Sequence, residues 1–137
     1  MPRPCVDLII ISKTQNFGMR KVLLLKRAIE PCKGAWALPG GMILRDETVL
    51  MACVRKAKEE IGIDLTIHDF NLVCIEDSFS ERHDICMTYI TEVPNNIQIK
   101  LDFQHTEFQW FSIYTLPVQM SGFVSKQLEK ARRFLHA

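Results

Sequence analysis

One interior stretch of the chain, residues 48–61, contains neither glycine nor proline. Apolar side chains recur in it every four positions, at Val49, Cys53, Ala57 and Ile61. This spacing places them on one face of a helix. Gly62 follows, and glycine is the usual left-handed residue directly after a helix. The stretch therefore predicts one interior amphipathic helix, around which the rest of the fold has to be built.

Most of the remaining chain has the aliphatic and β-branched character of strands. The strand-like runs are residues 5–12, 20–27, 72–75, 84–93 and 107–113. Residues 31–41 hold two prolines and three glycines, which predicts a loop around at most one short strand. The last fifteen residues have helical apolar spacing. Because strands outnumber helices and do not alternate regularly with them, we expect a mixed-sheet α/β or α+β domain.

Size and composition indicate one globular domain over residues 1–137, with 47% hydrophobic and 24% charged residues. Seventeen basic and sixteen acidic residues leave a formal charge of +1, so no bulk field attracts nucleic acid or a membrane surface. No apolar run approaches the roughly 20 residues of a membrane span, and no signal peptide is apparent. Five cysteines without a CxxC pair read as reduced core residues. We therefore expect a cytoplasmic protein.

Two acidic residues, Glu59 and Glu60, occupy the last turn of the predicted helix, where the helix dipole disfavours negative charge. Arg55 and Lys56 could pair with them at i,i+4, but with the base first this is the weaker orientation. A bound divalent cation would compensate them better. The alternative is a salt-bridged, solvated helix end.

The spacing around this helix resembles the Nudix box, GX5EX7REUXEEXGU, in which U is aliphatic. The matching residues are Gly41, Glu47, Arg55, Ala57, Glu59, Glu60, Gly62 and Ile63. The resemblance implies an α/β/α sandwich around a mixed sheet, and hydrolysis of nucleoside diphosphates linked to another group. One position departs from the box, because Lys56 stands where a glutamate is expected.

The chain also resembles the GDP-mannose mannosyl hydrolase branch of that family, which lacks the same glutamate. The shared residues include Asp7, Arg27, Trp36, the segment 39–41, Gln104 and His105. In that branch water attacks C1 of the sugar and a nucleoside diphosphate leaves with Mg2+. The resemblance implies a Mg2+ cofactor, with Mn2+ as a substitute, a nucleotide-sugar substrate and a homodimer.

The resemblance assigns roles to individual residues. His105 is the expected general base, with Glu60 and Arg55 as further catalytic residues. The expected metal ligands are Gly40 through its carbonyl, Glu59, Glu60 and Gln104. The expected substrate contacts are Asp7, Arg27 and His83. Independently of the resemblance, Asp7 lies among apolar residues, so its carboxylate requires a partner.

Two other functions stay open at this stage. The first is cleavage of a P–O bond in nucleoside triphosphates, ADP-ribose or related diphosphates, with Glu107, Glu76 or Glu81 as base. The second is a non-catalytic nucleotide-binding module in which Lys56 neutralises the metal site. The retained Glu47, Glu59 and Glu60 speak against this second function, because carboxylates beside a phosphate require a cation.

Overall fold

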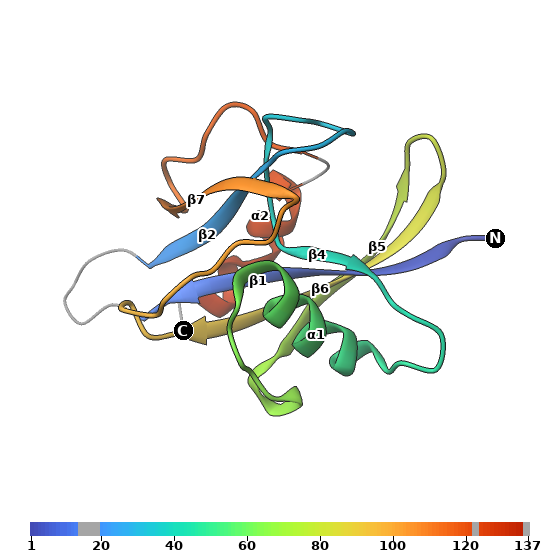
Figure 1. Ribbon diagram of the computed structural model, residues 1–137, viewed down its shortest axis with the longest axis horizontal. Helices are drawn as coiled ribbons and strands as arrows, with labels where there is room; N and C mark the ends of the chain where they lie inside the picture. Colours follow the sequence, from blue (N-terminus) through green and yellow to red (C-terminus); the bar gives the residue numbers. More distant parts are fainter. Residues whose placement is uncertain (14–19, 122–123, 136–137) are drawn as a thin grey trace.

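The computed structural model describes residues 1–13, 20–121 and 124–135 (Figure 1). The strands are β1 (Arg3–Ser12), β2 (Lys21–Arg27), β3 (Trp36–Ala37), β4 (Gly40–Met42), β5 (Asn71–Phe79), β6 (His83–Val93) and β7 (His105–Ser112). The helices are α1 (Val49–Ile61), the short 3-10 helix η1 (Ile67–Asp69) and α2 (Val124–Leu135). Neither α-helix in these ranges is long and apolar enough to cross a bilayer.

The strands form one mixed sheet with the order β3-β2-β1-β6-β5. β1 and β6 run parallel over the whole of β1, and the other strand pairs are antiparallel. β4 adds to β1 and β7 adds to β2 outside the main order. β1 therefore lies at the centre of the sheet and contacts most of its parts.

Alternate residues of β1 point to opposite faces of the sheet, and each face carries one hydrophobic cluster. Leu8 and Ile10 pack with α1 on one face, whereas Ile9 and Ile11 pack with α2 on the other. Figure 1 shows the two helices on opposite sides of the strands. The expected α/β/α sandwich around a mixed sheet is confirmed. Because β1 is covered on both faces, its run of aliphatic residues has no polar alternation.

The predicted interior helix is confirmed to within one residue, and both of its ends have a local cause. Thr48 is the N-cap, and its side chain accepts a hydrogen bond of 3.1 Å from the Met51 N–H. Gly62 ends the helix in the left-handed region with φ 69°, and its N–H donates to the Lys58 carbonyl. Both ends of α1 are thus held by local hydrogen bonds.

The glycine- and proline-rich segment holds two short strands, so the expectation of at most one was wrong. β4 pairs antiparallel with β1, with Gly40 opposite Asp7. A Cβ at Gly40 would lie 2.3 Å from the carbonyl oxygen of Val6, so only glycine permits this close approach. The expectation of core cysteines was wrong for Cys32, which is exposed in the loop after β2, whereas Cys5, Cys53 and Cys86 are buried.

Candidate active site

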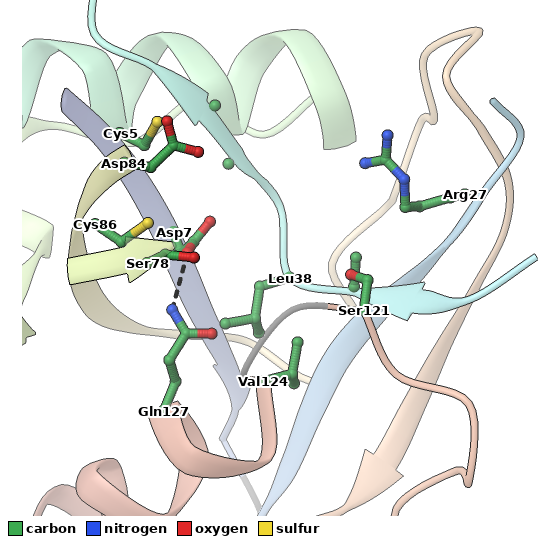
Figure 2. A pocket seen from close by; sticks show the side chains of 13 residues that line it. Cys5, Asp7, Arg27, Leu38, Ser78, Asp84, Cys86, Ser121, Val124 and Gln127 are labelled. Carbon is green, nitrogen blue, oxygen red and sulfur yellow. Dashed lines mark hydrogen bonds between the residues drawn. The ribbon is translucent and has the colours of Figure 1, made fainter. Parts of the chain in front are cut away.

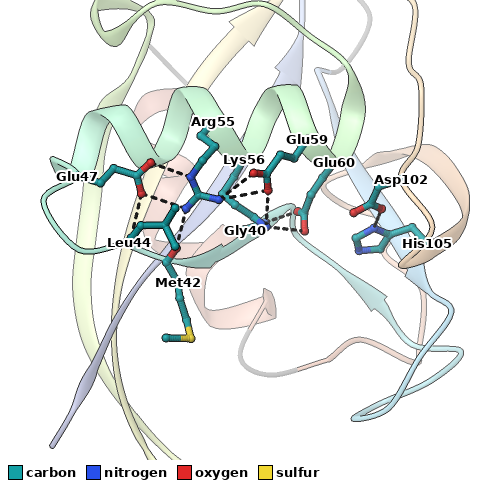
Figure 3. A network of polar contacts seen from close by, with 10 residues as sticks. All are labelled: Gly40, Met42, Leu44, Glu47, Arg55, Lys56, Glu59, Glu60, Asp102 and His105. Carbon is teal, nitrogen blue, oxygen red and sulfur yellow. Dashed lines mark hydrogen bonds and ion pairs between the residues drawn. The ribbon is translucent and has the colours of Figure 1, made fainter.

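Glu60 is buried at the end of α1, with only 3% of its surface exposed (Figure 3). Its Oε1 accepts a hydrogen bond of 2.7 Å from the backbone N–H of Gly40. Its Oε2 lies 3.4 Å from the Nζ of Lys56. Burial raises the pKa of Glu60, while the charges of Lys56 and His105 and the Gly40 N–H oppose that rise. The carboxylate is therefore a desolvated acceptor that a cation stabilises.

His105 is the first residue of β7, and its side chain is only 4% exposed. Its Nδ1 lies 2.7 Å from Oδ1 of Asp102, in the loop that precedes the strand. In the neutral imidazole, Nδ1–H donates to the Asp102 carboxylate, which can only accept, and Nε2 then carries the lone pair. The Ala28 N–H donates to the Gln104 carbonyl at 2.8 Å and holds this loop against the segment after β2.

Glu60, Asp102 and His105, here called the carboxylate–histidine cluster, offer ligand atoms that all lie within 4.8 Å of one another. Two carboxylates and one imidazole suit a divalent cation: Mg2+ prefers the oxygens, and Mn2+ takes both donor types. Glu60, a predicted ligand, is one of these three residues. Asp102 was not predicted, and its one sequence signal is an acid three residues before the histidine.

Glu59 and Arg55 lie beside the cluster and contact other groups. The Nη1 of Arg55 lies 3.1 Å from Glu59 Oε1, and Glu59 is 48% exposed. Arg55 also binds Glu47 through two hydrogen bonds of 2.7 and 3.0 Å, and donates 2.9 Å to the Met42 carbonyl. This guanidinium lowers the pKa of Glu47. Every nitrogen of Arg55 is therefore engaged with protein, and the geometry favours positioning of the loop after β4 over direct diphosphate binding.

On the opposite side of β4, toward α2, lies a cleft of about 250 Å³, here called the α2-side cleft (Figure 2). Residues that line it include Cys5, Asp7, Arg27, Asp84, Cys86 and Gln127. The predicted substrate contacts Asp7 and Arg27 are thus brought together at one opening. The Nε of Arg27 donates 2.6 Å to the Pro31 carbonyl, which anchors one edge of its guanidinium.

His83, the third predicted substrate contact, is not among the residues that line this cleft. It begins β6, where its ring stacks on Phe79 with centroids 4.4 Å apart. Its Nε2 lies 2.7 Å from Oδ1 of Asp77. These contacts place His83 on the β5–β6 hairpin, beside the opening.

Asp7 has the partner that its apolar surroundings require. Gln127 of α2 donates from Nε2 to Asp7 Oδ2 at 2.8 Å and to Thr88 Oγ1 at 2.9 Å (Figure 2). Burial raises the pKa of Asp7 to about 6, with smaller contributions from the charges of Glu60 and Asp84, whereas the Gln127 bond opposes the rise. The folded protein therefore holds this proton more tightly than the unfolded chain does.

This raised pKa predicts a pH-dependent stabilisation by Asp7→Asn. The pKa of Asp7 is 3.8 in the unfolded chain and about 6 in the folded protein. Protonation of Asp7 therefore favours the folded state, and this contribution to stability is lost as the pH rises through that range. Asparagine avoids that loss and keeps an oxygen for Gln127. We expect the free energy of unfolding of the variant to exceed that of wild type by up to about 3 kcal/mol at pH 8, and by little at pH 4.

Denaturant unfolding at both pH values measures the difference. Asp64→Asn is the control, because its side chain is 85% exposed. A gain that is equal at pH 4 and pH 8 would contradict the role given to Asp7.

Comparison with known proteins identifies the family. The chain matches the NUDIX domain over residues 1–131, and it belongs to the Nudix family. It is 32% identical over 98 residues to the low-salt glycan biosynthesis protein Agl8 of Haloferax volcanii, covering 66% of this chain and 62% of that protein. It is 34% identical over 98 residues to an ADP-ribose pyrophosphatase of Methanocaldococcus jannaschii, covering 71% of this chain and 57% of that protein. Both matches leave a large part of the relative uncovered.

Solved structures agree with this family at the level of the fold. A MutT NUDIX hydrolase from Burkholderia pseudomallei has a TM-score of 0.81 at 27% identity, over 95% of this chain and 98% of that one. The NUDIX domain of Shewanella oneidensis NrtR, crystallised with ADP ribose, has a TM-score of 0.79 at 19% identity, over 98% of this chain and 89% of that one.

Proposed function

We propose that this protein is a divalent-cation-dependent hydrolase of nucleoside diphosphate derivatives, and that its substrate is a nucleotide sugar of the GDP-mannose kind. The observation that carries the proposal is the buried Asp102–His105 pair beside Glu60. An imidazole whose Nδ1 proton is fixed by a carboxylate presents Nε2 as a base toward a water molecule. Glu60 and Asp102 supply oxygens for the cation at the same place.

In the proposed reaction, a water oxygen bonds to C1 of the sugar and its proton passes to Nε2 of His105. The bond between C1 and the diphosphate oxygen breaks, and the nucleoside diphosphate leaves with the electron pair. When bound, Mg2+ neutralises the charge that develops on this leaving group. The Gly40 carbonyl and Gln104 stay predicted ligands, and Glu59, also predicted as a ligand, contacts Arg55 and Lys56.

The α2-side cleft is the proposed place for the part of the substrate that carries no phosphate. Asp7 accepts hydrogen bonds from hydroxyl or N–H groups there, and Arg27 supplies a positive charge at the opening. The cytoplasmic location and the homodimer stay predictions.

Cleavage of a P–O bond in ADP-ribose or a similar diphosphate is the second candidate, and the 34% identical ADP-ribose pyrophosphatase favours it. Two of the glutamates considered as its base are engaged in ion pairs. Glu76 contacts Lys130 and Lys126, and Glu107 lies 3.3 Å from Lys26. Glu81 lies at the edge of the hairpin and is exposed.

Hydrolysis in oxygen-18 water separates the two candidates. We expect GDP-mannose or a related nucleotide sugar to be cleaved with Mg2+, with the label in the released sugar and none in the nucleoside diphosphate. ADP-ribose and nucleoside triphosphates serve as the comparison substrates in the same assay. Label in a phosphate group would contradict attack at C1 and establish the P–O reaction in its place.

A further inference from the structure

Lys56 lies where a cation would sit between two carboxylates of α1 (Figure 3). Its Nζ is 3.4 Å from Oε2 of Glu59 and 3.4 Å from Oε2 of Glu60. Its side chain is only 13% exposed. The ammonium is therefore held close to both acids and is largely removed from water.

The path of the Lys56 side chain depends on a neighbouring glycine. A Cβ at Gly41 would lie 2.8 Å from Cε and 3.0 Å from Nζ of Lys56. Such contacts are tighter than van der Waals packing allows, so any other residue at this position would displace the lysine stem. The missing side chain of Gly41 thus leaves room for the ammonium.

The charges around Glu60 are divided between its two sides. On one side Lys56 contacts Glu60 and Glu59. On the other side stand Asp102 and His105, within 4.8 Å of a Glu60 oxygen. Arg55 cannot take the place of Lys56, because its nitrogens are used by Glu47, Glu59 and Met42.

We propose that the Lys56 ammonium is a built-in cation that occupies the position between Glu59 and Glu60 and restricts the site to a single divalent cation. That cation binds on the other side of Glu60, where Asp102 supplies a second carboxylate. A second Mg2+ between Glu59 and Glu60 would need oxygens at about 2.1 Å and would face the like charge of the ammonium. The inference rests on the proposed function only through the cation site.

Counting bound Mn2+ tests this inference directly, without reference to activity. Free Mn2+ is measured by electron paramagnetic resonance while MnCl2 is added to the protein. We expect one bound Mn2+ per chain in wild type and two in Lys56→Gln. Lys58→Gln is the matched control, because it removes the same charge from an exposed position of the same helix. It should bind one ion.

The double variant Lys56→Gln/Glu59→Gln tests the location of the second ion. It restores the wild-type net charge but removes one carboxylate from the vacated position, so we expect one bound Mn2+. Two ions in wild type, or equal counts in Lys56→Gln and Lys58→Gln, would overturn the inference.

Thermal melting covers the case in which Lys56→Gln is unstable. If Lys56→Gln folds only when Mn2+ is present, the inference is supported, because the ion then replaces the ammonium. If Lys56→Gln does not fold even with Mn2+, the inference is overturned. The proposed function fails separately, when wild type binds Mn2+ but hydrolyses no nucleoside diphosphate derivative.

Discussion

Replacement of His105 with glutamine is expected to lower kcat by about a hundred- to ten-thousand-fold, the usual contribution of a positioned general base. Oδ1 of Asp102 lies 2.7 Å from Nδ1 of His105, and this contact directs Nε2 toward the proposed water. Glutamine retains hydrogen-bonding groups but cannot accept the proton. Substrate affinity should change little, because the lost interaction belongs to the transition state. Steady-state kinetics on the substrate identified by the oxygen-18 assay measures both quantities.

The same variant also separates two roles that the geometry permits for His105. A histidine with Nδ1 bound to a carboxylate is also a frequent metal ligand. When His105 acts only as the base, the His105→Gln variant should keep an affinity for Mn2+ near the wild-type value. A large loss of Mn2+ affinity would contradict the base and make His105 a ligand. His68→Gln, on the exposed helix η1, should match wild type in both measurements.

Glu60→Gln is expected to reduce turnover by about a hundredfold or more, comparable with loss of one strong electrostatic contact in an active site. Glutamine has nearly the same shape, and its oxygen can still accept the Gly40 N–H, so the backbone contact should persist. The negative charge is lost, however, and with it the attraction for the cation. We expect the Mg2+ concentration needed for half-maximal activity to rise strongly.

Glu59→Gln is the matched control for Glu60→Gln, since it makes the same chemical change one position away. Glu59 is half exposed and already paired with Arg55 and Lys56. Its replacement should therefore have a much smaller effect on turnover and on Mg2+ dependence. Equal losses in both variants would contradict the particular role of Glu60.

Local sequence patterns predicted the parts of the fold that depend on near neighbours in the chain. The apolar stripe and Gly62 located α1 because a helix is built from i,i+4 contacts. The aliphatic runs located the long strands because strands that are covered on both faces are nearly continuous in hydrophobic residues. β4 was missed because it forms only through the contact of Gly40 with β1, and no local pattern encodes a partner 33 positions away.

A motif singles out candidate site residues in the sequence, whereas tertiary contacts decide which groups those residues meet. The Nudix box indicated Glu60, and its burial at α1 agrees with a ligand. Arg55 was predicted as a further catalytic residue, and in the structure its nitrogens bind Glu47, Glu59 and the Met42 carbonyl. Asp7 was correctly expected to need a partner, yet Gln127 is 120 residues away and carries no signal of its own.

Gly40 joins the two halves of the proposed site through a single residue. Its N–H binds Glu60 on the α1 side, and its Cα has no room for a side chain against Asp7 on the α2 side. A shift of β4 would therefore change the surroundings of the Glu60 and Asp7 carboxylates at the same time. We therefore expect occupation of the α2-side cleft and occupation of the cation site to be linked through β4, so that each changes the other's affinity by the same factor.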